Sequence, residues 1–134
     1  MSKNSLLDTH ALLTLFQMEK GFERVRNELH SARKAHRKIH FSLVSYGEFC
    51  YILERRRGLE NLNRCRTILE GLPIQLTPIS REVVELAAHY KVHFPISFAD
   101  AICGATAKSL NASLFTADPD FKHLEKEIEV IWTR

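Results

Sequence analysis

The stretch NSLLDTHALLTLF, residues Asn4–Phe16, decides how this chain is expected to fold. Its first part, Asn4–Asp8, is a short apolar run that ends in an acid, and this pattern predicts a buried strand. Its second part, Thr9–Phe16, is predicted to be a helix. A strand followed directly by a helix is typical of α/β proteins with parallel strands.

The same order of strand and helix recurs along the rest of the chain. The further predicted strands are Ile39–Ser42, Ile74–Thr77, Ser113–Thr116 and Glu129–Trp132. The further predicted helices run from Phe22 into a basic stretch, over Ser45–Arg57, over Leu59–Glu70, from Ser80 to Pro95, over Phe98–Ser109, and briefly from Asp118 onward. This alternation predicts one α/β domain over residues 1–134, in which helices flank both faces of a parallel sheet of about five strands.

Length and composition favour an ordinary globular protein. The chain has 134 residues, of which 45 % are hydrophobic and 26 % are charged. No stretch approaches the roughly 20 apolar residues of a membrane span, and the first apolar run stops at Asp8, unlike a signal peptide. We therefore expect a cytoplasmic protein without membrane contact. The three cysteines form no C-x-x-C pair, so neither a zinc ribbon nor a redox motif is predicted.

Basic residues are concentrated in two clusters, although the net charge is only +3. The first cluster lies between Arg24 and His40 and contains Arg24, Arg26, Arg33, Lys34, Arg37 and Lys38. The second is Arg55–Arg57. Each cluster is either a solvated helix face or a rim that contacts nucleic-acid phosphates, which would bind in a salt-dependent way. The sequence leaves both interpretations open.

Four acidic residues fall where a parallel sheet would bring them together. Asp8 ends the first predicted strand, and Asp118 follows the strand Ser113–Thr116. Glu48 and Asp100 lie in the predicted first turns of the helices that begin at Ser45 and Ser97. In open parallel sheets, ligands bind just beyond the carboxyl ends of the strands, and the following helices start at that edge. We therefore expect the four side chains to converge.

Such a convergence requires a cation. Two carboxylates about 5 Å apart repel each other by about 3 kcal/mol at an effective dielectric constant near 20. A set of oxygen ligands selects a hard cation such as Mg²⁺ or Mn²⁺ over zinc. These ions activate water and stabilise the charge on a phosphodiester, so the pattern points to phosphodiester hydrolysis.

Helix capping is an alternative explanation for each acid. The stretches Ser45–Glu48 and Ser97–Asp100 both match the capping-box pattern, in which a serine precedes an acid by three residues. Asp118 precedes Pro119, as an N-cap residue often does. Asp8 is also in a possible N-cap position, although an acid between an apolar strand and an apolar helix suggests a further role. Spacing alone does not separate these alternatives.

Four stretches resemble the motifs of one known family. They are LLDTHALL (Leu6–Leu13), VSYGEF (Val44–Phe49), SFADA (Ser97–Ala101) and LFTADPDF (Leu114–Phe121). They resemble, in the same order and at similar spacing, the motifs of PIN domains, especially those of VapC-like toxins. The resemblance implies a five-stranded parallel sheet flanked by helices and Mg²⁺- or Mn²⁺-dependent cleavage of single-stranded RNA. It also implies that Asp8 and Asp100 are the main metal ligands.

The resemblance also assigns roles to neighbouring residues. Glu48 and Asp118 would complete the acidic pocket, while Thr9 and Thr116 would position the site by hydrogen bonds. Asp120 is a secondary candidate for the fourth acid. VapC-like proteins are typically homodimers and are held inactive by an antitoxin, so the resemblance implies both partners. It implies no organic cofactor.

Three other functions remain as alternatives. A housekeeping RNA-processing nuclease would have the same fold and chemistry, and an adjacent antitoxin gene would argue against it. A PIN fold could also serve as a binding scaffold without activity, although the complete set of acids disfavours this. A phospho-receiver module is a further α/β alternative, but it needs adjacent acids after its first strand and a lysine near its last one. The chain has only Asp8 at the first of these places.

Overall fold

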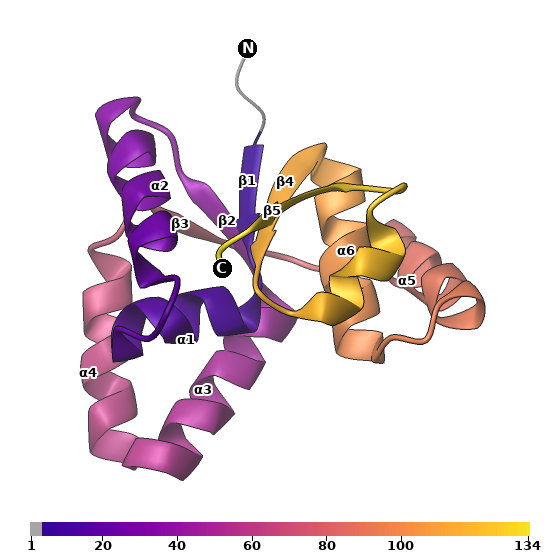
Figure 1. Ribbon diagram of the computed structural model, residues 1–134. Helices are drawn as coiled ribbons and strands as arrows, with labels where there is room; N and C mark the ends of the chain where they lie inside the picture. The colour runs from indigo at the N-terminus through magenta and orange to yellow at the C-terminus, as the bar shows by residue number, and fades with distance from the viewer. Residues whose placement is uncertain (1–3) are drawn as a thin grey trace.

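The computed structural model describes residues 4–134, which fold around one parallel sheet of five strands (Figure 1). The strands are β1 (Asn4–Leu7), β2 (Ile39–Ser42), β3 (Ile74–Thr77), β4 (Ala112–Thr116) and β5 (Glu129–Trp132). Their order across the sheet is β3-β2-β1-β4-β5, and every neighbouring pair is parallel. The predicted α/β fold is confirmed, while the first three residues of the expected domain lie outside the described part.

Helices cover both faces of this sheet, as predicted. They are α1 (Thr9–Gln17), α2 (Phe22–Lys34), α3 (Leu43–Arg57), α4 (Leu59–Glu70), α5 (Arg81–His93), α6 (Phe98–Leu110) and the short 3₁₀ helix η1 (Pro119–Leu124). Helices α1–α4 pack in one core cluster with Leu7 and Phe41, whereas α5, α6 and η1 pack in another with Leu6 and Leu114 (Figure 1). Among the helices within residues 4–134, none is long and apolar enough to span a bilayer.

The strand order creates a crevice at one place on the sheet. The chain proceeds from the central strand β1 to β2 and β3 on one side, and then returns to β4 and β5 on the other. The connections therefore leave β1 and β4 in opposite directions beyond their carboxyl ends. This is the switch point at which open α/β sheets bind ligands. Asp8 follows β1 there, and Asp118 follows β4 by two residues.

Helix α3 begins earlier than predicted, and this corrects one interpretation of Glu48. The helix starts at Leu43, and its N-cap is Ser42, whose Oγ accepts a hydrogen bond from the Ser45 amide at 3.1 Å. Ser42 ends β2 in extended conformation and can therefore cap the helix without a connecting loop. Glu48 consequently lies in the second turn of α3. It does not form a capping box with Ser45, so that alternative was wrong.

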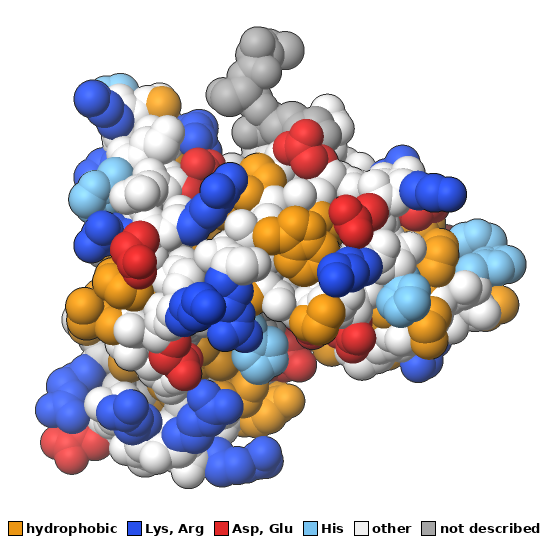
Figure 2. Space-filling model, in the orientation of Figure 1, with side chains coloured by type: hydrophobic (Ala, Val, Ile, Leu, Met, Phe, Trp, Pro, Cys, Tyr) orange, Lys and Arg blue, Asp and Glu red, His pale blue; other side chains and the backbone are white. Residues whose placement is uncertain are grey.

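The two basic clusters lie on different elements, the first along α2 and the short segment after it, and the second at the end of α3. Figure 2 shows Lys and Arg side chains over α2 and, separately, around the end of α3 and the beginning of α4. The first cluster follows α2 toward the amino end of β2, the edge opposite the acids. The second, Arg55–Arg57, forms the last turn of α3, which starts at the acidic edge.

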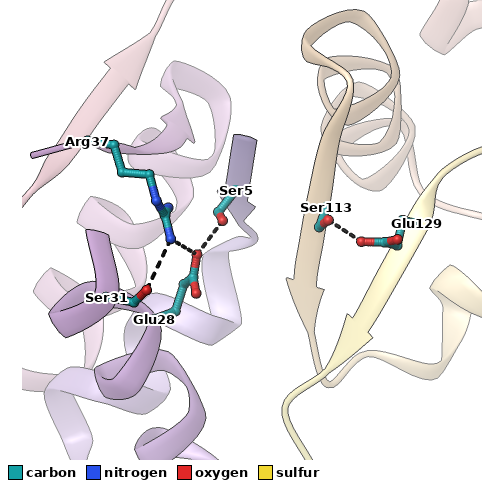
Figure 3. A network of polar contacts seen from close by, with 6 residues as sticks. All are labelled: Ser5, Glu28, Ser31, Arg37, Ser113 and Glu129. Carbon is teal, nitrogen blue, oxygen red and sulfur yellow. Dashed lines mark hydrogen bonds and ion pairs between the residues drawn. The ribbon is translucent and has the colours of Figure 1, made fainter. Parts of the chain in front are cut away.

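Polar contacts at the amino edge neutralise part of the first cluster. Glu28 accepts hydrogen bonds from the Ser5 hydroxyl and from Nη2 of Arg37, the latter at 3.1 Å (Figure 3). On the neighbouring strands, Ser113 donates to Glu129. Arg37 is therefore held in an internal ion pair, and the solvated or structural interpretation describes this end of the first cluster better than a substrate rim.

Candidate active site

Asp8 is a buried carboxylate that begins helix α1. Its Oδ1 accepts a hydrogen bond from the Ala11 amide at 2.7 Å, and its Oδ2 accepts one from the Thr116 hydroxyl. The residue is only 5 % exposed. Burial raises the pKa of Asp8 to about 6, because the loss of hydration outweighs the two hydrogen bonds, which favour the charged form. Asp8 is thus an N-cap, as the sequence allowed, and also a carboxylate that ionises reluctantly.

Thr116 connects the ends of β1 and β4. Its hydroxyl donates to Asp8 and accepts a hydrogen bond from the Asp118 amide at 3.0 Å. Asp118 in turn caps η1, because its Oδ1 accepts from the Asp120 amide at 2.9 Å. One buried hydroxyl therefore positions two of the predicted acids, which are far apart in the sequence. The supporting role of Thr116 in the site stays a prediction.

Glu48 reaches the same place from α3. Its Oε1 accepts a hydrogen bond from the Thr9 hydroxyl at 2.7 Å, and the Ser45 carbonyl lies 3.4 Å from the same hydroxyl. Thr9 directly follows Asp8 in the chain, so the contact brings Glu48 to the end of β1. Glu48 lies in the second turn of α3 and therefore cannot cap the helix. Its hydrogen bond with Thr9 explains its position instead.

Asp100 lies in the first turn of α6, where its amide donates to the N-cap residue Ser97 at 3.1 Å. The pKa of Asp100 is raised to about 6, first by burial and then by the charges of Asp118, Asp8 and Glu48. Like charges raise a carboxyl pKa only when they are close. The structure therefore brings the four predicted acids together, and the first-turn placement of Asp100 is confirmed.

The donor set of this site fits a hard divalent cation. Carboxylate oxygens of Asp100, Asp118 and Asp120 lie within 4.8 Å of one another. Asp8, Glu48 and Asp100 line an adjoining cavity of about 20 Å³, which is large enough for one water-sized particle. The charged donors of this set are carboxylates, as Mg²⁺ and Mn²⁺ prefer. Asp120, the secondary candidate, lies in the same group as Asp118.

Cys103 and Ser45 also line the acidic cavity, although neither was predicted as a site residue. Cys103 is one helical turn after Asp100 on α6, a spacing that could have revealed it. Burial and the nearby charges of Asp8 and Asp100 raise the pKa of its thiol well above the usual value. The thiol is therefore neutral at pH 7 and contributes packing, not a thiolate ligand.

Replacing Asp100 with asparagine is expected to stabilise the metal-free protein at pH 7 by about 1 to 2 kcal/mol. The full pKa rise corresponds to about 3 kcal/mol at 1.36 kcal/mol per unit, and partial exposure of the side chain reduces the effect. Asparagine keeps the shape of the side chain and removes its charge. The free energy of unfolding in urea, with excess chelator, measures the difference.

The pH dependence of stability provides a second check. Because the pKa of Asp100 is higher in the folded protein than in the unfolded chain, its stabilising contribution is complete below pH 4 and is lost as the pH rises through about 6. The advantage of Asp100→Asn should thus disappear near pH 4. Glu54→Gln, which removes an exposed carboxylate elsewhere, should change little. A destabilised Asp100→Asn protein would contradict the repulsion among the four acids.

The sequence matches one protein-family model, that of the PIN domain, over residues 5–127. Among curated protein sequences, none matches significantly. A chain of a toxin-antitoxin complex from Klebsiella pneumoniae is 20 % identical, with a TM-score of 0.76 and 98 % of both chains covered. A chain of promoter-DNA-bound VapBC2 from Rickettsia felis is 16 % identical, with a TM-score of 0.78 and 96 % of this chain and 97 % of that one covered.

A third solved structure is described as a toxin that cleaves the sarcin-ricin loop. It is VapC20 from Mycobacterium tuberculosis, which is 19 % identical, with a TM-score of 0.63 and coverage of 90 % of this chain and 94 % of that one. At identities this low, the likeness to the three structures shows a shared fold and nothing more.

Proposed function

Because this chain belongs to the PIN domain family, a family of nucleases, we propose that it is an endoribonuclease that cleaves single-stranded RNA with Mg²⁺ or Mn²⁺. The observation that carries the proposal is the gathering of Asp8, Glu48, Asp100 and Asp118 at the switch point of the sheet, where burial and then the charges of the other three acids raise the pKa of Asp100 to about 6. The repulsion among these groups is relieved by a bound cation. The similar fold of an RNA-cleaving toxin is consistent with RNA as the substrate.

The proposed roles of the acids are those that the resemblance to PIN domains implies. Asp8 and Asp100 would be the main ligands of the ion, and Glu48 and Asp118 would complete the pocket. When bound, the ion activates water and stabilises the charge that develops on the phosphodiester. Thr9 holds Glu48, and Thr116 holds Asp8 and the amide of Asp118, so the carboxylates are oriented before any ion arrives.

We further propose that the nuclease is a toxin with an antitoxin partner, acts in the cytoplasm and uses all 134 residues as one domain. Structurally similar chains come from toxin-antitoxin complexes, which supports the antitoxin. A homodimer is also proposed, because the resemblance to VapC-like toxins implies one. PIN membership removes the phospho-receiver alternative, whereas a housekeeping nuclease remains the alternative to a toxin.

The experiment that tests the nuclease is a cleavage assay on purified protein without any co-expressed partner. Fluorescent single-stranded RNA is incubated with the protein in Mg²⁺, in Mn²⁺ or in excess chelator. We expect cleavage with either ion, none in chelator, and a higher melting temperature when the ion is added. Cleavage that persists in chelator would contradict the metal-dependent mechanism. Folded protein that neither cleaves RNA nor gains stability from the ions would instead favour the scaffold alternative.

A further inference from the structure

A groove of about 330 Å³ opens directly beside the acidic cavity. Helix α1 contributes His10 and Thr14 to its lining, and the end of α3 contributes Arg56. The segment Ala117–Pro119 and Arg134 also line the groove. Polar and charged side chains therefore surround a space large enough for part of an extended polymer.

The groove is continuous with the candidate active site. His10 lines both the groove and the acidic cavity, and Asp118 belongs to both the groove and the acid cluster. From His10 the groove follows α1 toward Gln17, whose Oε1 accepts a hydrogen bond from Nη1 of Arg56 at 3.4 Å. Seven residues of helix span about 10 Å. The groove thus leads from the acids to Arg56 over a short, defined path.

Arg56 brings an uncompensated positive charge to the far end of this path. Its side chain is exposed, its hydrogen-bond partner Gln17 is neutral, and within residues 4–134 it takes part in no ion pair. A guanidinium group binds phosphate through two parallel hydrogen bonds. Other Lys and Arg side chains surround the end of α3 and the beginning of α4 (Figure 2). An anionic strand that extends beyond the groove would therefore lie on a positively charged surface.

We propose that this groove, the Arg56 groove, binds the single-stranded RNA next to the scissile phosphodiester, with Arg56 contacting a backbone phosphate. The inference rests on the proposed nuclease function. It assigns the substrate path to the second basic cluster and not to the first, whose last residues, Arg33 to Lys38, lie toward the opposite edge of the sheet. A phosphate contact positions the strand without reading its sequence.

The groove also contains an acid that opposes RNA binding. Glu19 lines it together with Arg56, and within residues 4–134 Glu19 forms no ion pair. Asp118 is the other acid of the lining, and a bound cation would compensate it. Removing the charge of Arg56 and removing that of Glu19 should therefore change RNA affinity in opposite directions.

The test measures RNA binding separately from cleavage. The fluorescence anisotropy of a labelled single-stranded RNA is followed in excess chelator over a range of salt concentrations. We compare wild type, Arg56→Gln, Glu19→Gln and Lys34→Gln, an exposed lysine of the first cluster. Each phosphate contact contributes about 0.7 to the slope of log K against log salt for single strands. Arg56→Gln is expected to reduce the slope by about that amount and to weaken binding about fivefold, or more at low salt.

The other variants and the cleavage assay make the result decisive. Glu19→Gln is expected to tighten binding, and Lys34→Gln to leave affinity and slope unchanged. In cleavage assays Arg56→Gln should raise KM with little change in kcat. An unchanged slope for Arg56→Gln, an equal loss for Lys34→Gln, or an unchanged KM for Arg56→Gln in Mg²⁺ would contradict the proposed RNA-binding role of the groove. If one of these results is obtained and wild type still shows metal-dependent cleavage, only the proposal that the Arg56 groove binds RNA is refuted. If wild type shows no such cleavage, the proposed nuclease function is refuted as well.

Discussion

Asp8→Asn is expected to lower kcat/KM for RNA cleavage by about 10³-fold or more. The substitution removes the most buried of the four carboxylates and therefore a main ligand of the proposed ion. Metal ions supply several kcal/mol of stabilisation to a phosphoryl transition state, and about 4 kcal/mol corresponds to 10³ in rate. Asparagine also caps helices about as well as aspartate, so the contact with the Ala11 amide can persist. The loss should thus be catalytic and not a loss of folding.

The measurement combines initial rates on labelled RNA with Mg²⁺ titrations followed by melting temperature. Wild type should be stabilised by Mg²⁺, whereas Asp8→Asn should respond only at much higher concentrations. Asp120→Asn is the matched control, because Asp120 is an exposed acid and the secondary candidate in the same acid cluster. Its activity should stay within about tenfold of wild type. An Asp8→Asn protein with near-normal kcat/KM would refute the assignment of Asp8 as a main ligand, and a large loss for Asp120→Asn would favour Asp120 over Asp118 as the fourth acid.

The second large effect is expected from Thr116→Val, with a loss of about 10- to 100-fold in activity and in Mg²⁺ affinity. Thr116 is fully buried, and its hydroxyl is hydrogen-bonded to both the Asp8 carboxylate and the Asp118 amide. Valine has the same shape but no hydroxyl, so both acids lose the group that orients them. Residues that orient metal-binding side chains typically contribute 10- to 100-fold in affinity or activity.

Thr116→Ser is the conservative partner of this variant, since serine restores the hydroxyl without the methyl group. It should recover most of the lost activity and most of the Mg²⁺ response. A merely structural role for Thr116 would give the opposite ranking, with the isosteric valine variant more active than the serine variant. Equal activity of wild type and Thr116→Val at limiting Mg²⁺ would show that this hydroxyl does not organise the site.

Local patterns in the sequence were enough to predict most elements of the fold. The strands Ile39–Ser42, Ile74–Thr77 and Glu129–Trp132 have the bounds expected from apolar runs and the breakers around them. The caps at Ser80 and Ser97 also form as predicted, with side chains that accept from backbone amides three residues later. These signals can be read from a sequence because each depends on neighbours only a few residues away.

The start of α3 shows where local patterns fail. The stretch Ser45–Glu48 has the form of a capping box, but Ser42 has an equally good capping side chain at the end of β2. The pairing of β2 with β1 and β3 holds Ser42 in extended conformation, so the helix begins directly after it. The tertiary structure therefore determines which of the two serines caps α3. It also places Glu48 within hydrogen-bond distance of Thr9, which lies 39 residues earlier in the chain.

The sequence by itself determined the alternation of strands and helices, the parallel sheet and the edge at which its acids collect, because periodicity and capping act over short distances. Only the tertiary structure decided the strand order β3-β2-β1-β4-β5, the contact between Asp8 and Thr116 across 108 residues, and the place of Arg56 in a groove that His10 also lines. These features depend on which elements pack together when the core excludes water. No short stretch of sequence carries that information, since packing is shared among residues from the whole chain.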